Sequence, residues 1–222
     1  KDVYEHTLTV LEQAIALEHR VSPDGPDFVT RFAALMHDVG KPATRRFERG
    51  GRVTFHHHEV VGAKLTARRM RALRFSSDEI RDVSRLVELH LRFHGYGTGE
   101  WTDSAVRRYV RDAGHLLSRL HVLTRADCTT RNRRKAAALQ RAYDDLERRI
   151  ERLAKEEEIS KIRPDLDGNQ IMELLGIGPG PLVGRAWKHL LEFRLDKGPQ
   201  DPETVRAELL RWWSEQPESK GR

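Results

Sequence analysis

The chain has 222 residues, of which 38% are hydrophobic and 33% are charged, and its formal net charge is +6 at pH 7. This composition is typical of a globular chain of one large domain, or of one domain with an appendage. The sequence contains neither an apolar run long enough to span a bilayer nor a signal-peptide pattern. A single cysteine, Cys128, excludes an intramolecular disulfide and favours a cytoplasmic location.

Two amphipathic helices are predicted first, over residues 2–19 and 27–39. In the second helix, apolar residues recur at helical spacing and are expected to be buried: Phe28, Phe32, Leu35 and Val39. Gly40 is the residue expected just past the helix end, and Pro42 is expected to stop any continuation. The helix therefore places His37 and Asp38 side by side at its C-terminal end. A buried carboxylate is costly unless it is paired or binds metal, so the pair is either a core hydrogen bond or part of a metal site.

The remaining chain is also predicted to be mostly helical. Residues 46–55 suggest a small hairpin turning at Gly50 and Gly51, and Ser76 with Glu79 forms a capping-box pattern. Further helices are expected over residues 57–74, from residue 77 to about His90, over 102–113, and over 115–158 as one or two long helices. The composition changes at Pro164. We therefore expect an all-α bundle with a small β-hairpin insertion over residues 1–160, and a helical tail over 161–222.

Further candidate metal ligands lie on other predicted helices. His6 and Asp127 each lie on the apolar face of a helix, so His6, His37, Asp38 and Asp127 form an ordered set. Imidazole and carboxylate ligands suit a divalent metal: Ni, Mn, Co, Fe, Mg or Zn. Such a metal would act as a Lewis acid and activate water for phosphoester hydrolysis. His58 and His90 are candidates for a second metal, and His58 also for a substrate phosphate; the alternative is solvated imidazoles. Lys41 could neutralise phosphate charge, or be a cation at the C-terminus of a helix.

Basic residues form two stripes that suit a polyanion such as tRNA. The first includes Arg68, and the second includes Arg131, Arg133, Arg134 and Lys135. The alternative is an ordinary solvated helix face. In the tail, Gly178 and Gly180 would allow a sugar-phosphate chain to approach the backbone, or simply form a tight turn.

The ordered set His6, His37, Asp38 and Asp127 resembles the HD superfamily of metal-dependent phosphohydrolases. Six stretches resemble the HD region of bacterial, actinobacterial-type CCA-adding tRNA nucleotidyltransferases of the poly(A) polymerase family: residues 4–11, 35–44, 55–62, 91–96, 102–109 and 125–131. Residues 167–176 and 178–184 resemble the tRNA-binding tail of the same class. The resemblance implies tRNA 3′-end CCA addition and repair in a full enzyme. For the HD region it implies hydrolysis of nucleotides or of 2′,3′-cyclic phosphates at RNA 3′ ends.

The sequence departs from that family in one respect. It contains no Gly-Ser followed by an Asp-x-Asp strand, so the nucleotidyltransferase active site is absent and this chain alone is not expected to add CCA. The chain does not begin with Met, and we expect a fragment whose N-terminal nucleotidyltransferase domain is missing. Two alternatives remain open: a free-standing HD nucleotide phosphohydrolase, and a non-catalytic tRNA-binding body.

Overall fold

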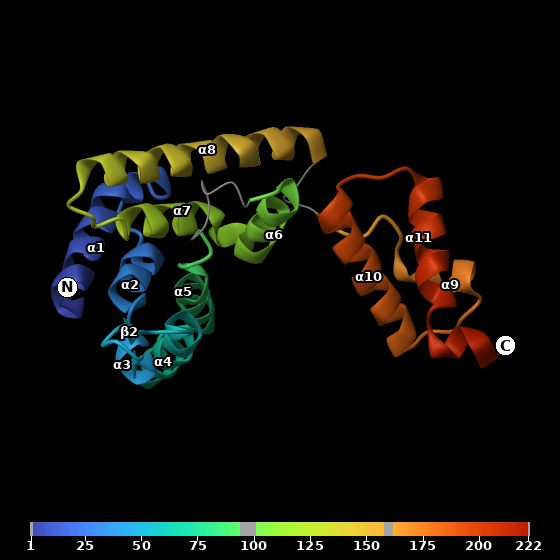
Figure 1. The fold of residues 1–222 in the computed structure, drawn as a ribbon, viewed down its shortest axis with the longest axis horizontal. Coiled ribbons are helices and arrows are strands. Elements are labelled where there is room, and N and C mark those ends of the chain that lie inside the picture. Colours follow the sequence, from blue (N-terminus) through green and yellow to red (C-terminus); the bar gives the residue numbers. More distant parts are fainter. Residues whose placement is uncertain (1, 94–100, 158–161, 222) are drawn as a thin grey trace. The chain divides into compact units, whose positions relative to one another are not determined.

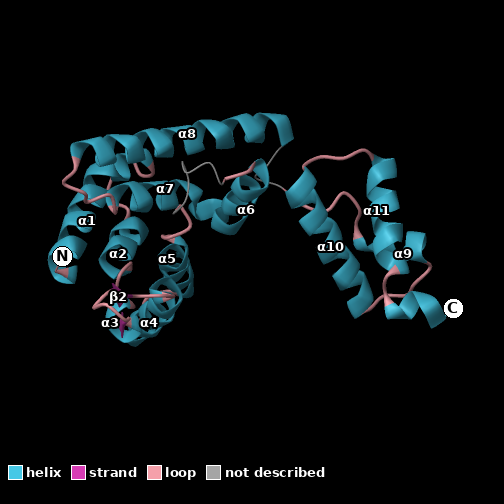
Figure 2. Ribbon diagram, in the orientation of Figure 1, coloured by secondary structure: helices cyan, strands magenta, loops and turns pink. Residues whose placement is uncertain are grey.

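The computed structural model describes residues 2–93, 101–157 and 162–221 (Figure 1). These residues are mostly helical, with one short antiparallel hairpin (Figure 2), so the predicted all-α class is confirmed. The described residues fall into two compact units: unit 1 contains residues 2–93 and 112–147, and unit 2 contains residues 101–111, 148–157 and 162–221. The domain boundary expected at residue 160 stays a prediction. In the described part of the chain, no helix is both long and apolar enough to cross a membrane.

Unit 1 is a helical bundle with the hairpin at one end. Its helices are α1 (Val3–Leu17), α2 (Phe28–Met36), α3 (Lys41–Thr44), α4 (His58–Ala72), α5 (Ser77–Leu89), α7 (Leu117–Ala126) and the first part of α8 (Arg133–Glu157). Short 3-10 turns cover Glu18–Arg20 and Gly114–Leu116, and the strands are β1 (Arg46–Phe47) and β2 (Val53–Thr54). Helix α2 packs against α1, α5 and α7, so it lies at the centre of the bundle.

The local signals in unit 1 act as the sequence predicts. Ser76 caps α5 in a complete capping box with Glu79. The hairpin pairs Arg46 with Thr54, and it turns at Gly50 and Gly51, whose φ angles of 86° and 78° favour glycine. The predicted helices over residues 2–19 and 57–74 correspond to α1 and α4.

The buried face of α2 differs from the predicted one. Phe28 is 37% exposed and Leu35 is 42% exposed. The buried residues of the helix are small: Thr30, Ala33 and Ala34. Small side chains let three neighbouring helices approach α2 closely, whereas the ring of Phe28 stacks at the edge of the bundle on the ring of Phe75. The face of α2 that leads to His37 is therefore its small-residue face.

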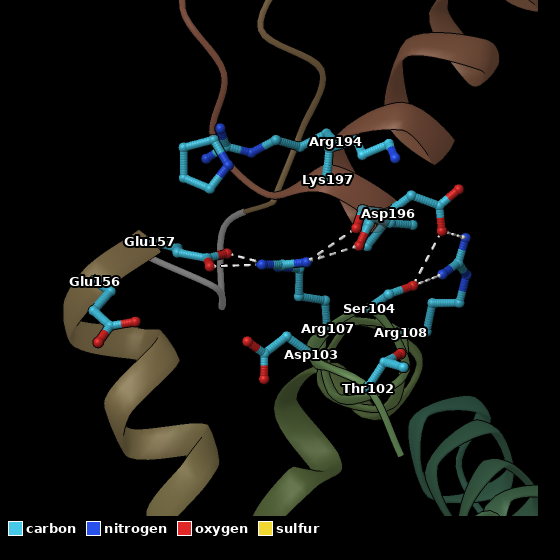
Figure 3. A network of polar contacts seen from close by, with 12 residues as sticks. Thr102, Asp103, Ser104, Arg107, Arg108, Glu156, Glu157, Arg194, Asp196 and Lys197 are labelled. Carbon is cyan, nitrogen blue, oxygen red and sulfur yellow. Dashed lines mark hydrogen bonds and ion pairs between the residues drawn. The ribbon is translucent and has the colours of Figure 1, made fainter. Parts of the chain in front are cut away.

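Unit 2 has its own core. It contains residues 103–111 of α6 (Asp103–Ala113), the end of α8, α9 (Gly168–Leu175), α10 (Pro181–Lys197), α11 (Pro202–Ser214) and a last turn over Pro217–Gly221. The core consists of Ile171, Leu175, Ala186, Leu190, Val205 and Leu209. A polar network also joins elements within this unit (Figure 3): Arg107 donates to both carboxylate oxygens of Glu157 at 2.7 Å and to the carbonyl oxygen of Leu195 at 3.1 Å.

Candidate metal centre

Six polar side chains from different helices converge in unit 1. All but one lie at helix ends, which the packing of the bundle brings together. They are His6 within α1, His37 and Asp38 just after α2, His58 at the start of α4, His90 at the C-cap of α5, and Asp127 at the C-cap of α7. These are the six residues for which the sequence predicts a metal-binding role.

The first group of donor atoms comprises those of His6, His37 and Asp127. The Nε2 atom of His6 lies 3.0 Å from Oδ1 of Asp127 and 3.3 Å from Nε2 of His37. The same Asp127 oxygen lies 3.7 Å from Nε2 of His37. Three atoms of the kind that bind metals, each supplied by a different helix, therefore lie close to one another.

Asp38 connects this group to a second one. Its Oδ2 atom lies 3.3 Å from Nε2 of His37 and 3.4 Å from Nε2 of His6. Its Oδ1 atom lies 3.3 Å from Nε2 of His58. The Nε2 atom of His90 is buried and makes no hydrogen bond to the described residues. The donor atoms of Asp38, His58 and His90 all lie within 4.8 Å of one another.

The backbone orients the buried imidazoles. The Nδ1 atoms of His37, His58 and His90 lie 2.7, 2.8 and 2.7 Å from the carbonyl oxygens three residues earlier. A carbonyl oxygen only accepts, so each Nδ1 carries a hydrogen. A ring that is neutral then presents the lone pair of Nε2 to the centre, and a ring that is protonated donates from Nε2. His6 is held differently, through a contact of 3.1 Å between its Nδ1 and Oγ1 of Thr129. Thr129 is not among the residues predicted from the sequence, where its only signal is its position two residues after Asp127.

The pKa values of the cluster reflect strong coupling between opposite charges. Burial raises the pKa of Asp38, but hydrogen bonds from His37, His58 and Lys41 outweigh it and hold the carboxyl well below its usual range. Burial lowers the pKa of His37, yet the neighbouring carboxylates of Asp38 and Asp127 outweigh it and raise the value. Burial dominates at His90 and lowers its pKa to about 4. Asp38 is thus anionic and His90 neutral near pH 7, the forms in which each side chain binds a metal.

The structure of the loop after Asp38 differs from what the sequence predicts for Gly40 and Pro42. Gly40, with φ −79° and ψ −16°, is the N-cap of α3, so it is not the residue just past the end of α2, which ends at Met36. It is glycine because an added Cβ would lie 2.1 Å from the carbonyl oxygen of His58. Pro42 lies in the first turn of α3 instead of only ending α2. Lys41 starts the same helix and its Nζ lies 2.6 Å from Oδ2 of Asp38, so it is an ion-pair partner of the cluster and not a cation at a helix C-terminus.

Part of the predicted RNA-binding set lies beside the cluster. A pocket of about 610 Å³ is lined by Asp127, Cys128, Thr129, Thr130, Arg131, Lys135 and Leu139. It places the cations of Arg131 and Lys135 in the same pocket as a carboxylate of the cluster. Other predicted RNA-binding residues lie elsewhere on exposed surface: Arg68 on α4, and Arg133 and Arg134 on α8. Gly178 and Gly180 belong to unit 2, where they are exposed and nothing lies within 4 Å of a Cβ added to either.

Comparisons with known proteins give a consistent result. A family model, the HD domain, matches residues 3–132, which include all six cluster residues. The A-adding tRNA nucleotidyltransferase of Deinococcus radiodurans is 33% identical over 219 residues, which cover 98% of this chain and 48% of that protein. The CC-adding tRNA nucleotidyltransferase of Thermus thermophilus is 35% identical over 210 residues, which cover 94% of this chain and 44% of that protein. The chain thus spans about half the length of these curated relatives.

Proposed function

The chain belongs to the HD-domain family, and we propose that its His/Asp cluster binds divalent metal and hydrolyses phosphoester bonds, with 2′,3′-cyclic phosphates at RNA 3′ ends as the substrate class. One observation carries the proposal: the Nε2 atoms of His6 and His37 each lie 3.0–3.7 Å from a carboxylate oxygen of Asp38 and from one of Asp127. Two imidazoles and two carboxylates fit Ni, Mn, Co, Fe, Mg or Zn. His58 and His90 would extend the site to a second ion through Asp38.

The chain's own groups have separate parts in this reaction. A bound cation would supply Lewis-acid polarisation of the phosphate and an acidified water. His37 and Asp38 act together, because one carboxylate contacts the imidazoles of both halves of the cluster. Lys41 forms an ion pair with Asp38 and would balance the charge of a bound phosphate. Arg131 and Lys135, which line the pocket beside Asp127, would hold the flanking phosphates of an RNA end.

We further propose that the chain is the HD and tail portion of a tRNA nucleotidyltransferase, and that tRNA is its partner. The similarity to two tRNA nucleotidyltransferases over nearly the whole chain supports this. The exposed basic residues Arg68, Arg133 and Arg134, and the open glycines Gly178 and Gly180, would contact the tRNA. A tRNA substrate and the single Cys128 both favour a cytoplasmic location.

Hydrolysis of 2′,3′-cyclic AMP with added Ni²⁺, Mn²⁺ or Co²⁺ tests the proposal. Asp38→Ala is expected to reduce metal-dependent turnover by at least about 100-fold, because it removes the carboxylate shared by the cluster. The matched control is Asp24→Ala, which changes an exposed aspartate of the same unit and should keep full activity. Circular dichroism establishes that both variants are folded. Absence of turnover with every metal would contradict the hydrolase.

Two other functions make different predictions in the same assay. A free-standing nucleotide phosphohydrolase would prefer a deoxynucleoside triphosphate or guanosine tetraphosphate to an RNA end. A non-catalytic tRNA-binding body would bind tRNA equally well before and after Asp38→Ala and would hydrolyse neither substrate. The similarity to tRNA nucleotidyltransferases supports an RNA end over a free nucleotide, and the set of His6, His37, Asp38 and Asp127 supports a hydrolase over a non-catalytic body.

A further inference from the structure

The hairpin of unit 1 carries an unusual surface that the metal cluster does not explain. Phe47 is 72% exposed, which makes it the most exposed of the large apolar side chains in the described part of the chain. It pairs in register with Val53 on the neighbouring strand, and Val53 is 40% exposed. Cross-strand partners share one face of a hairpin, so the two side chains form a small apolar platform facing solvent.

The platform is surrounded by positive charge. Residues 45–55 contain four arginines, Arg45, Arg46, Arg49 and Arg52, against the single acid Glu48. All four arginines are exposed, and none has an ion pair with any residue that the structure describes. The guanidinium of Arg45 lies 5.2 Å from the ring centroid of Phe47, over its face. An exposed aromatic ring among unpaired arginines matches single-stranded nucleic acid, whose bases stack and whose phosphates need counter-charge.

A groove beside the platform is lined by hairpin residues and by one residue of the metal cluster. A pocket of about 500 Å³ is lined by Arg52, Val53, Thr54, Phe55, His56, His57, His58, Glu59 and Leu91. Its lining includes Val53 of the hairpin platform and His58, whose Nε2 lies 3.3 Å from Oδ1 of Asp38. The residue before His58, His57, has φ 61° and ψ 22°, a left-handed conformation that is uncommon outside glycine. The hairpin, which lies beside α3 and α4 in Figure 1, therefore shares this groove with one residue of the metal cluster.

We infer that the hairpin groove binds single-stranded RNA, with one base stacked on Phe47, backbone phosphates paired with Arg49 and Arg52, and the RNA end directed toward His58. This inference rests on the proposed function, since it names the substrate-recognition surface of the same site. It makes the hydrolase selective for a strand over a mononucleotide, because only a strand spans from the platform to the cluster. The net positive charge of the hairpin favours a nucleic acid over a protein as the occupant of the platform.

Binding of a fluorescein-labelled, unstructured RNA octamer in EDTA, followed by fluorescence anisotropy, tests the inference without any metal. Phe47→Ala should weaken binding about 5-fold or more, the loss expected for one base stack, while Phe47→Trp should restore it. The matched control Leu73→Ala removes a side chain that is 51% exposed at the far end of α4 and should bind as wild type. Equal RNA affinity of Phe47→Ala, Leu73→Ala and wild type would overturn the inference and would favour a protein, not RNA, as the partner that contacts Phe47.

The salt dependence separates stacking from charge. Arg52→Gln should reduce the slope of log affinity against log salt by about 0.7, the value for one lost contact with a single strand. Arg52→Lys keeps the charge and should keep the slope, and Phe47→Ala should leave the slope unchanged. An octamer series with one abasic position adds a direct check: wild type should lose affinity at one position, and Phe47→Ala should lose none there. A uniform loss at all positions in both proteins would contradict stacking on Phe47.

The two proposals fail in different ways. If only the hydrolase is wrong, Phe47→Ala still weakens RNA binding in EDTA while no metal gives turnover. If only the hairpin groove is wrong, wild type and Phe47→Ala bind the octamer equally while metal-dependent hydrolysis of 2′,3′-cyclic AMP is intact and depends on Asp38.

Discussion

Gly40 lies where the loop after Asp38 passes closest to the start of α4. A methyl group added here would lie 2.1 Å from the carbonyl oxygen of His58 and 2.7 Å from the backbone nitrogen of Gly62. Both are backbone atoms, so the contact can be relieved only by moving α4 away from the loop. Because α4 begins with His58 and the loop follows Asp38, such a movement would separate two members of the cluster.

Gly40→Ala should therefore reduce both stability and metal affinity. We expect the free energy of unfolding to fall by about 2 kcal/mol or more, as for other overpacked sites, with weaker binding of Mn²⁺ in a titration. Gly25→Ala is the matched control, because nothing lies within 4 Å of the Cβ it would add. If Gly40→Ala melts and binds Mn²⁺ like Gly25→Ala, the close approach is not a constraint on the site.

His121 gives a pH-dependent prediction outside the cluster. Burial lowers its pKa to about 4, although Glu147 lies 3.8 Å away. Between pH 6.5 and 4 the unfolded chain therefore binds more protons than the folded one. The contribution of neutral His121 to the free energy of unfolding is thus fully present above pH 6.5 and is lost as the pH falls. The free energy of unfolding of the wild type should therefore fall by about 2 kcal/mol between pH 7 and pH 5 because of His121, and His121→Gln should abolish this part of the fall. Urea unfolding in EDTA at both pH values measures it, and equal pH dependence of variant and wild type would refute it.

At the scale of single residues, the sequence predicted which side chains would meet but not how they are held. The types and order of His6, His37, Asp38 and Asp127 pointed to a common centre, and in the structure both imidazoles contact both carboxylates. Their role as metal ligands stays a proposal. The sequence did not show that carbonyl oxygens three residues back orient three of the imidazoles, because that contact depends on rotamer and loop geometry. Nor did it show the reason for Gly40, which lies in a contact between distant segments.

At the scale of helices, two N-caps of the same type allow a controlled comparison. Asp27 caps α2 and accepts from the backbone nitrogen and hydroxyl of Thr30, and Asp201 caps α11 in the same way with Thr204. Only Asp27 also accepts from Arg119 of α7, at 2.9 Å. Asp27 therefore caps the helix that leads to His37 and Asp38, and its ion pair with Arg119 links this helix to α7.

Asp27→Ala should cost more stability than Asp201→Ala. Loss of the cap alone is expected to cost about 1 kcal/mol, which is the value for Asp201. Loss of Asp27 adds a broken, partly buried ion pair and should reach about 3 kcal/mol in total. Hydrogen exchange of amides in α2 and α11 measures each loss in its own helix. Equal costs for the two substitutions would mean that Arg119 contributes nothing to the position of α2.

Helix positions were predictable because their signals are local. Capping residues, the Gly50–Gly51 turn and apolar periodicity defined the elements within a few residues. The buried face of α2 was not predictable, because periodicity favours large apolar residues. Three helices crowd α2, so its buried positions are Ala33, Ala34 and Thr30, while Phe28 remains at the edge. The sequence alone does not say how many neighbours a helix has.

At the scale of the whole molecule, bound metal should stabilise the folded chain. A ligand that binds only the folded state at 100 times its dissociation constant adds about 2.7 kcal/mol. The gain should shrink as the pH falls, because the carboxylates around His37 raise its pKa and the metal must displace that proton. Thermal melts with Mn²⁺ or EDTA at pH 8 and pH 6 measure this stabilisation. Circular dichroism is the signal, because all four tryptophans belong to unit 2 and their fluorescence would not report on the unit that holds the cluster. A shift that is larger at pH 6 would contradict the assignment of His37.

The overall class was predictable from composition and periodicity, whereas the division into units was not. Residues 101–111 and 148–157 group with the tail helices in unit 2, and Arg107 with Glu157 illustrates contacts that join distant segments there (Figure 3). A sequence reading places boundaries where composition changes, as at Pro164. The long helix α8 shows no such change where its residues pass from unit 1 to unit 2.

The most direct test of the account is the metal content of the chain after equilibrium dialysis against Mn²⁺, compared between wild type and Asp38→Asn. This substitution keeps the shape of the side chain and removes the charge that contacts both halves of the cluster. We predict at least one bound ion per wild-type chain and almost none in the folded variant. Equal metal content in the two proteins would place any bound ion elsewhere and would contradict the metal centre on which the proposed function depends.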